Sequence, residues 1–345
     1  MNPAKIKGVI DGFKDKTRRM KLARQAVFKQ LASAWAEAAE LPPEIRARLD
    51  REAPVFSLAP VRESVSGDGK TVKAALGTAD GQVIESVLML HEDGRRTVCV
   101  SSQVGCPMGC AFCATGRLGL TRDLTAEEII DQVLYFARLL KNGAFSAAPG
   151  TAATITNVVV MGMGEPMHNL DAVLAAFREL NGPDALGLGG RQFTVSTCGI
   201  VPGILRLADE KPPVNLAVSL HAPNQALRER LMPVAGAYPL DRLLDACRVY
   251  AEKTGRKIMF EYLLIDGVND GEAQAEELAR LMDHPLYHVN LIKYHSTGAF
   301  SASPLDRRER FQRLLWDKYR VPVTLRTSFG EDIDAACGQL AGKRE

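Results

Sequence analysis

The sequence predicts an α/β fold built on a parallel sheet, either a barrel or a doubly wound sheet. From about Arg96 onward, short apolar runs alternate with helical stretches, which is the pattern of strands that are joined by helices. Most of these runs are apolar almost without interruption, as in strands that are buried on both faces. Hydrophobic residues make up 46% and charged residues 24% of the 345 residues, so the chain can bury a substantial core.

The first fifty residues are predicted to be helical. Apolar residues recur at helical spacing from Ile6 to Phe13, and a second apolar stripe runs from Ala26 to Ala38. Pro42 and Pro43 interrupt the pattern, and a short helix is expected over residues 44–50.

A hairpin is predicted next. Two β-type runs, Thr71–Leu76 and Val83–Leu90, lie on either side of a turn that contains Asp80 and Gly81.

The remaining elements are predicted to alternate. The expected strands are Thr97–Ser101, Thr156–Met161, Gln192–Ser196, Val214–Leu220, Ile258–Leu264, His288–Tyr294 and Val321–Arg326. The expected helices are Thr125–Leu140, Leu170–Leu180, Leu240–Glu252, Glu272–Met282 and Arg307–Tyr319.

Polar residues gather where several of the predicted strands end. In parallel α/β folds the carboxyl ends of the strands meet at one rim, and the chemistry takes place there. We therefore expect a site formed by Gly162-Met163-Gly164-Glu165, Ser196-Thr197, Ser219-Leu220-His221 and His295-Ser296.

Charge is spread unevenly along the chain. The formal net charge is +2, but residues Met1–Arg51 carry twelve Lys or Arg and six Asp or Glu, which leaves about −4 for the rest. A basic N-terminal arm suggests contact with a polyanion. A solvated helix face explains the same charge equally well.

Several classes of protein are excluded or not expected. The chain has no apolar run long enough to cross a membrane, and its basic start lacks the apolar stretch of a signal peptide. We therefore expect a cytosolic protein. Its seven cysteines are then expected to serve a metal or catalysis rather than a disulfide framework.

The most informative string is Cys106-Pro107-Met108-Gly109-Cys110-Ala111-Phe112-Cys113, which follows a predicted strand directly. Three thiolates in so short a loop can converge on one inorganic centre. A structural zinc site requires four ligands, and the nearest fourth thiol is Cys99. Three cysteines on a four-iron cluster instead leave one iron open for a small molecule, and C-x-x-x-C-x-x-C is the signature of radical S-adenosylmethionine (SAM) enzymes.

From about Glu85 to Gly342 the chain resembles the RlmN/Cfr family of RNA adenosine methyltransferases. Six motifs occur in the family's order: C-V-S-S-Q-V-G-C ending at Cys106, F-C-A-T-G from Phe112, G-M-G-E-P from Gly162, S-T-C-G-I-V-P from Ser196, S-L-H-A-P-N from Ser219 and D-I-D-A-A-C-G-Q-L from Asp332.

The resemblance implies a radical SAM core, a partial (βα)6-type TIM barrel, with an N-terminal helical accessory domain and a β-hairpin. The expected division is a basic, RNA-contacting helical domain over residues 1–60, a hairpin extension carrying Glu85 over 61–95, the core over 96–330 and a segment carrying Cys337 over 331–345.

The resemblance also implies the cofactors and their ligands. Cys106, Cys110 and Cys113 would hold a [4Fe-4S] cluster, and SAM would chelate the open iron. The positions that match the family's SAM contacts are Gly164, Glu165, Ser196, Ser219, Leu220, His221 and His295. At the last of these the family has Asn-Pro where this chain has His295-Ser296, and a histidine can donate a hydrogen bond in place of the asparagine.

Two further cysteines and a glutamate match the family's catalytic residues. In the implied mechanism the Cys337 thiolate first accepts a methyl group from SAM. A 5′-deoxyadenosyl radical from a second SAM abstracts hydrogen from that methyl group, and the resulting methylene radical adds to the adenine ring. Glu85 then accepts a proton, and Cys99 attacks the Cys337 sulfur and releases the methylated base. The disulfide that forms must be reduced in each cycle, which suits a reducing cytosol. Judged without the resemblance, Glu85 would be an exposed strand carboxylate. Cys247 is interpreted as a core residue and Cys198 as a residue that packs behind the SAM site.

The expected reaction is methylation of carbon 2 of an adenosine in 23S ribosomal RNA, at the peptidyl-transferase centre, and in transfer RNA. Gly164-Glu165-Pro166 and Ser196-Thr197-Cys198-Gly199 are similar to RlmN, whereas Lys293-Tyr294 and Ser328-Phe329-Gly330 are closer to Cfr, which methylates carbon 8.

The expected partners are RNA and an electron donor such as flavodoxin, and a monomer is expected. The alternatives are Cfr-like methylation, another radical SAM reaction, and a zinc-dependent, non-catalytic RNA-binding protein.

Overall fold

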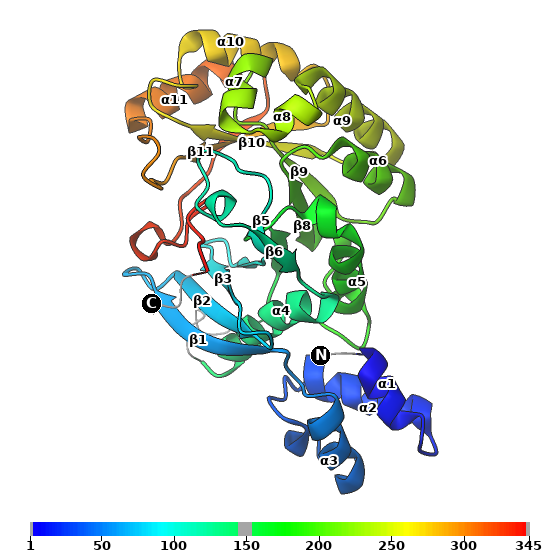
Figure 1. Ribbon diagram of the computed structural model, residues 1–345. Helices are drawn as coiled ribbons and strands as arrows, with labels where there is room; N and C mark the ends of the chain where they lie inside the picture. The colour runs from blue at the N-terminus through cyan, green and yellow to red at the C-terminus, as the bar shows by residue number, and fades with distance from the viewer. Residues whose placement is uncertain (1–2, 144–153, 343–345) are drawn as a thin grey trace.

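The structure is a computed structural model that describes residues 3–143 and 154–342. Its centre is a ten-stranded sheet with the order β1-β2-β3-β4-β7-β8-β9-β10-β11-β12, and a separate pair, β5-β6, lies beside it (Figure 1). No helix in these ranges is both long enough and apolar enough to cross a membrane.

Seven strands form the parallel part of the sheet, and they are neighbours in chain order. A doubly wound sheet would reverse its order at a switch point. The two ends of this run, β4 and β12, are not neighbours in the sheet, so the fold is a partial barrel, as the resemblance implied. The strands are β4 (Arg96–Cys99), β7 (Asn157–Val160), β8 (Phe193–Thr197), β9 (Asn215–Ser219), β10 (Ile258–Leu264), β11 (Tyr287–Lys293) and β12 (Val323–Leu325).

Helices follow most of these strands and cover the outer side of the sheet, while the C-terminal stretch lies on the inner side near β3 (Figure 1). Helix α4 begins at a capping box, in which Thr125 accepts from the Glu128 N–H and Glu128 accepts from the Thr125 N–H. The helices are α4 (Ala126–Lys141), α5 (Leu170–Asn181), α6 (Val201–Glu210), α7 (Gln225–Leu231), α8 (Val234–Ala237), α9 (Leu240–Thr254), α10 (Glu272–Leu281) and α11 (Leu305–Arg313), which continues as a π-helical turn over Leu314–Lys318.

An antiparallel extension continues the sheet beyond β4. The predicted hairpin is present as β2 (Thr71–Thr78) and β3 (Val83–Leu90), and β3 pairs with β4. The sequence analysis missed β1 (Leu58–Val65), whose residues are mostly exposed or half-buried, and the small sheet of β5 (Gln103–Cys106) and β6 (Gly119–Asp123).

The N-terminal region contains three helices, α1 (Pro3–Ile10), α2 (Lys16–Phe28) and α3 (Pro43–Glu52). The expectation of one apolar helical stripe from Ala26 to Ala38 was wrong, because α2 ends at Phe28. The chain then turns back so that the buried indole of Trp35 donates to the Ala53 carbonyl over 2.7 Å. The apolar residues of this stripe are therefore buried partly by the end of α2 and partly by the segment that turns back after it.

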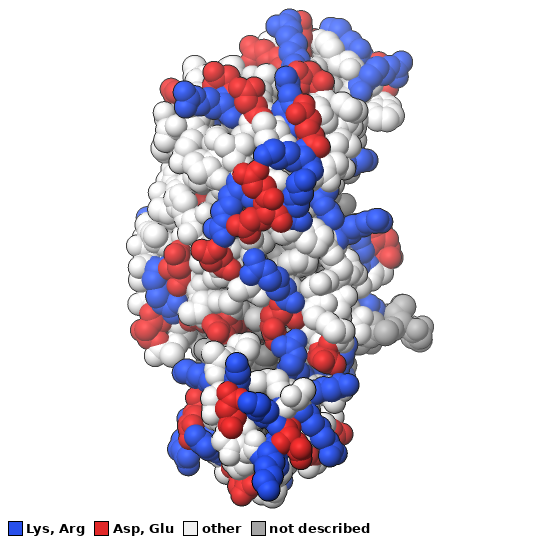
Figure 2. Space-filling view, turned by 90° about the vertical axis from the view of Figure 1, so that its right-hand side faces the viewer, with Lys and Arg blue, Asp and Glu red and all other residues white. Residues whose placement is uncertain are grey.

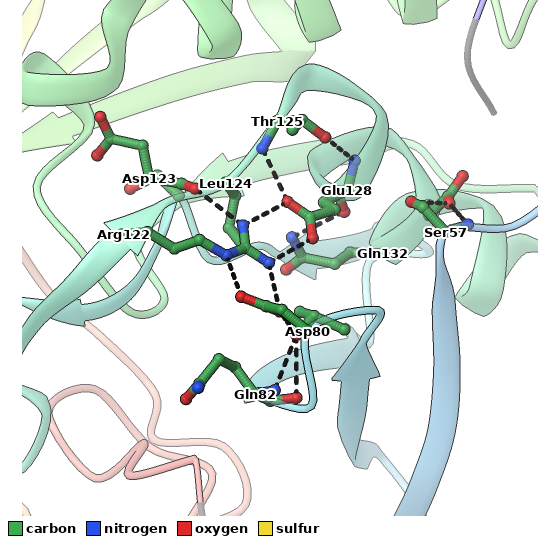
Figure 3. A network of polar contacts seen from close by, with 12 residues as sticks. Ser57, Asp80, Gln82, Arg122, Asp123, Leu124, Thr125, Glu128 and Gln132 are labelled. Atoms are coloured by element: carbon green, nitrogen blue, oxygen red, sulfur yellow. Dashed lines mark hydrogen bonds and ion pairs between the residues drawn. The ribbon is translucent and has the colours of Figure 1, made fainter. Parts of the chain in front are cut away.

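Arg122 on β6 fastens the β2–β3 turn to the start of α4 (Figure 3). Its guanidinium donates to both carboxylate oxygens of Asp80, over 2.8 and 2.9 Å, and to both oxygens of Glu128, over 2.8 and 2.9 Å. The side chain of Arg122 is 30% exposed and that of Glu128 is 8% exposed, so the pair lies largely out of water. Three separate segments thus depend on one side chain.

We expect Arg122→Ala to destabilise the protein by about 2 kcal/mol, because the buried Glu128 carboxylate would lose its charged partner. Thermal unfolding monitored by circular dichroism should show a midpoint several degrees lower. Arg95→Ala is the matched control, since Arg95 forms an exposed ion pair with Asp93 and its loss should move the midpoint very little. Equal effects of the two substitutions would contradict the role given to Arg122.

Candidate active site

A cavity that is open to solvent lies at the carboxyl ends of the parallel strands. Its wall contains most of the site residues expected from the sequence, although they are spread over more than two hundred positions of the chain. Those residues are Cys99, Cys106, Cys110, Cys113, Gly164, Glu165, Ser196, Ser219, His221, His295 and Cys337. The fully buried Leu220 and the carboxylate of Glu85 do not belong to this wall.

The cysteine loop follows β5, and close contacts fix the β5–β6 pair from which it extends. Gly105 has a φ of 78°, and a Cβ there would lie 1.9 Å from the Gly119 carbonyl oxygen, so only glycine fits. At the base of the loop, the Asn169 amide donates to the Ser102 and Leu124 carbonyls over 2.8 and 2.7 Å. These contacts fix the loop with its three thiols toward the cavity.

Six cysteines line the cavity. One of them is Cys198, which packs beside Glu165, and the thiols of the other five fall into two groups according to their electrostatic neighbours. Burial raises the pKa of Cys106 to about 12 and also raises the pKa of Cys110. The charge of Cys113 raises both pKa values further. Burial also raises the pKa of Cys99 to about 12, but its thiol neighbour is Cys337 rather than any residue of the cysteine loop. Cys99 therefore does not join the loop as a fourth ligand.

The three thiols of the cysteine loop suit a cationic centre. Buried thiols with raised pKa values ionise readily only beside positive charge, and thiolates are the usual ligands of iron–sulfur clusters. Within residues 3–143 and 154–342, no three His, Cys, Asp or Glu side chains are placed to hold a single metal ion. A three-thiolate donor set on one wall of an open cavity fits a cluster that keeps one iron free for a ligand.

Gly164 and Glu165 follow β7 and lie against the start of the cysteine loop. Gly164 has a φ of 106°, and a Cβ there would lie 2.7 Å from the Ser102 hydroxyl and from the Gln103 side chain. The buried Glu165 carboxylate accepts from the Cys198 N–H over 2.7 Å and from the Met167 N–H over 3.0 Å. Two backbone donors thus fix the direction of a negative charge at the cavity wall, where it can attract a cationic amino group.

His221 is a neutral donor at the end of β9. Its Nδ1 accepts from the Leu263 N–H over 3.1 Å, so the proton of the neutral ring is on Nε2. Burial is the main cause that lowers the pKa of His221 to about 3, and the positive charge of Arg228 also lowers it. The ring packs edge-on against Phe112 of the cysteine loop, with the centroids 4.7 Å apart. His221 therefore also links β9 to that loop.

His295 lies in the cavity wall at the position where this chain departs from the family pattern. Its side chain is buried, and its Nδ1 lies 3.5 Å from the Glu331 carboxylate without a hydrogen-bond partner. Burial lowers the pKa of His295, and the charge of Glu331 opposes this shift. His295 therefore keeps an unpartnered ring nitrogen beside the Glu331 carboxylate.

Cys337 is carried by the C-terminal segment, which here means residues 331–342. The residue is exposed toward the cavity, yet the surrounding walls desolvate its thiol enough to raise its pKa, while the charge of Arg326 opposes the shift. The Ala114 N–H donates to the Gly338 carbonyl over 2.7 Å, and the Thr115 hydroxyl donates to the Leu340 carbonyl over 2.5 Å. The segment is thus docked directly beside the cysteine loop.

Glu85 is placed differently from what its sequence context suggests. The expectation of an exposed strand carboxylate was wrong, because the residue is 1% exposed. Its carboxylate accepts from the N–H groups of Ala341 and Gly342 over 2.7 and 3.2 Å. The C-terminal segment lies over Glu85, outside the wall of the cavity.

The sequence analysis missed two charged residues of the wall, Glu261 on β10 and Arg326 after β12. The buried Glu261 carboxylate accepts from the Asn290 amide over 3.0 Å and lies 3.7 Å from the Arg326 guanidinium. The positive charge of Arg326 lowers the pKa of both Cys99 and Cys337 and so opposes the effect of burial. A glutamate within the apolar run Ile258–Leu264 was the signal that could have revealed this pair.

Comparison with known proteins gives a consistent result. Residues 100–281 match the family described as the radical SAM superfamily. A probable dual-specificity RNA methyltransferase RlmN from Moorella thermoacetica is 47% identical, with 91% of this chain and 89% of that protein covered. A dual-specificity RNA methyltransferase RlmN 1 from Myxococcus xanthus is 45% identical, with 91% and 86% covered.

A solved structure is also similar over nearly the whole chain. The crystal structure of a radical SAM methyltransferase from Sphaerobacter thermophilus superposes with a TM-score of 0.92 at 45% identity. The match covers 99% of this chain and 98% of that one, so the extension and the N-terminal helices are included. Membership of the radical SAM superfamily brings with it a [4Fe-4S] cluster and SAM as cofactors.

Cys99 and Cys337 are neighbours but differ in their exposure to solvent, so their two environments predict different reactivity toward iodoacetamide under anaerobic conditions. At pH 8, Cys337 should be alkylated because it faces the open cavity. Cys99 should remain unmodified because its pKa of about 12 leaves about one thiol in ten thousand ionised. The Cys99 rate should rise about tenfold per pH unit above neutrality, since the thiolate fraction does so. Peptide mapping by mass spectrometry gives both rates, with the fully buried Cys247 as the internal control. Equal labelling of Cys99 and Cys337 at pH 8 would show that the two environments are not distinct.

Proposed function

Because this chain belongs to the radical SAM superfamily and, within it, to the RlmN family of RNA methyltransferases, we propose that it methylates carbon 2 of an adenosine in RNA. We propose 23S ribosomal RNA, at the peptidyl-transferase centre, and transfer RNA as its targets. The observation that carries the proposal is the position of Cys337, whose thiol faces the same cavity as the three thiols of the cysteine loop.

In the proposed site, Cys106, Cys110 and Cys113 hold the cluster, and SAM binds against Gly164, Glu165, Ser196, Ser219, Leu220, His221 and His295. When bound there, the cluster and SAM would supply the radical chemistry that can remove a hydrogen atom from a methyl group. Glu165 attracts the amino group of SAM, and the Nε2–H of His221 donates a hydrogen bond to SAM. The backbone of Leu220, whose side chain is buried, completes the turn between Ser219 and His221.

Cys337 carries the one-carbon unit in this proposal. Its thiolate attacks the methyl carbon of SAM, so that an S–CH3 bond forms as the methyl–sulfonium bond breaks and S-adenosylhomocysteine leaves. Arg326 favours the thiolate by its charge. After the carbon has been joined to the adenine, the enzyme and RNA are linked through Cys337.

Cys99 releases the product. Its thiolate attacks the Cys337 sulfur and the new S–S bond forms. The electron pair of the broken C–S bond passes to the methylene carbon, which takes up a proton and becomes the methyl group. The two thiols are already electrostatic neighbours in the structure. A reductant must then return the disulfide to two thiols, which suits a cytoplasmic protein, and an electron donor such as flavodoxin would serve the cluster.

The basic N-terminal helices support contact with RNA. Lys and Arg side chains gather over this region at the bottom of Figure 2, with acidic side chains among them. We propose a division into an RNA-contacting domain (1–60), a hairpin extension with Glu85 (61–95), the core (96–330) and the C-terminal part with Cys337 (331–345), in a chain that acts as a monomer.

The central test is mass spectrometry of nucleosides from RNA treated with the cluster-containing enzyme. We expect 2-methyladenosine from the wild-type protein and no methylated adenosine from Cys337→Ala, because the carrier sulfur is lost. Cys247→Ala is the control, since this core cysteine lies outside the cavity wall. Formation of 8-methyladenosine would show Cfr-like chemistry instead. Methylation by Cys337→Ala would exclude the two-thiol mechanism.

The basic arm predicts a strong dependence of RNA binding on salt. Replacing the exposed residues Lys14, Arg18 and Lys21 by alanine should weaken binding and reduce the slope of log K against log salt by about 2, since each phosphate contact releases counterions. Filter binding at several salt concentrations measures this slope. The same number of charges removed from α9, at Arg242, Arg248 and Lys253, should leave it unchanged. Equal slopes for both variants would argue against RNA contact by this arm.

A further inference from the structure

Glu85 lies on the face of β3 that looks toward the cavity. Alternate residues of a strand share a face, and Val87 and Met89, the next two positions on the face of Glu85, line the cavity. Glu85 is therefore the next side chain in a row that forms the cavity wall. It is excluded only because the C-terminal segment, with Leu340 at the cavity edge, lies across it.

The carboxylate of Glu85 is fully engaged while the segment is docked. One oxygen accepts from the N–H groups of Ala341 and Gly342 over 2.7 and 3.2 Å. The other oxygen lies 3.3 Å from the Lys73 ammonium group. Both carboxylate oxygens therefore face donors of the segment or of Lys73.

Lys73 holds the other end of the same segment. Its ammonium group donates to the Asp334 carbonyl over 3.1 Å, in addition to its ion pair with Glu85. The side chains of Lys73 and Glu85 are 8% and 2% exposed, so each charge depends on the other. Together they bind the chain before and after Cys337, and Cys337 lies between these two anchored points.

The docking contacts differ in kind on the two sides of the segment. On the side of the cysteine loop, the contacts are neutral hydrogen bonds to the Gly338 and Leu340 carbonyls. On the side of the extension, they come from charged side chains, and hydrogen bonds to charged groups are the stronger kind. Lys293 also pairs with Glu331, and the Gly67 N–H donates to Asp332, at the start of the segment. The Lys73–Glu85 pair is the charged restraint that holds the chain on both sides of Cys337.

We propose that Lys73 and Glu85 form the docking site that positions the Cys337 segment, and that undocking of residues 341–342 turns the Glu85 carboxylate toward the cavity as a free proton acceptor. Lys73 is a positioning residue that acts through Glu85. The movement of the methyl carrier and the availability of the base are thereby one event, so no free base faces the cavity while the segment is docked. The docking part stands on contacts alone, whereas the use of Glu85 as a base rests on the proposed function.

The docking part is tested on the full-length, cluster-containing protein without substrate. Lys73→Met and Glu85→Gln should each speed amide exchange at Ala341 and Gly342, and alkylation of Cys337, by at least about tenfold, because the charged restraint is lost. Lys70→Met is the matched control on the same hairpin, since Lys70 pairs with Glu92 on the surface. Hydrogen exchange and peptide mapping by mass spectrometry give the two rates. Unchanged rates in both variants would overturn the docking site.

A second variant leaves the buried charges intact. Ala341→Pro removes the N–H that donates to Glu85 over 2.7 Å and should also speed alkylation of Cys337. It provides the test if either change to the buried pair prevents folding. Alkylation at the wild-type rate would overturn the proposal in this case too.

The coupling to the base is tested separately with RNA. Glu85→Gln should accumulate a covalent RNA adduct of Cys337, visible on a denaturing gel, because no carboxylate can take the proton. Lys73→Met keeps the carboxylate and should not accumulate the adduct. Absence of the adduct in Glu85→Gln, or equal amounts in both variants, would overturn the base assignment. If the wild-type enzyme forms no methylated adenosine, the proposed function fails while the exchange and alkylation results still decide the docking part.

Discussion

The parallel direction of strands β4 and β7–β12 is the constraint on which the site depends. Their carboxyl ends lie along one edge of the sheet, so the loops that follow them open into one cavity. The groups of the proposed reaction either follow these strands or lie on segments that dock beside them. In particular, Cys99 ends β4, and Cys337 is brought back from the far end of the chain to face it. Residues separated by more than two hundred positions can cooperate only because this edge is continuous.

The electrostatics of the cavity keep several of its thiols protonated until a positive charge is nearby. Burial raises the pKa values of Cys99, Cys106 and Cys110, so these thiols remain protonated until positive charge is present. For the loop cysteines, that charge would come from iron. For Cys99 and Cys337, the chain supplies Arg326, which is in turn held near Glu261. The two groups of thiols thus receive their compensating charge from different sources.

The sequence predicted the buried parts of the fold better than the exposed ones, and the reason is visible in particular elements. The strand expected over Ile258–Leu264 has those bounds in the structure, because a long apolar run with both faces covered leaves little choice. Strand β1 was missed because its outward residues are charged or exposed, and α6 because Pro202 and Gly203 are typical of a loop. The cysteine motif identified the cavity. No periodicity could show that Glu85 is buried, because its cover comes from the distant residues 341–342.

The antiparallel extension is joined to the barrel by contacts that determine the position of Cys99 itself. Val87 pairs with Cys99 across β3 and β4, and the Ser86 hydroxyl donates to the Cys99 carbonyl over 2.8 Å. From the other direction, the Ser101 hydroxyl donates to the Glu85 carbonyl over 2.6 Å. The backbones that carry Cys99 and Glu85 are therefore fixed by each other. Arg122 anchors the far end of the hairpin in the same way (Figure 3), so a shift of the extension would move one wall of the cavity with it. The extension that the sequence sets apart as a hairpin is, in its contacts, a structural part of the active site.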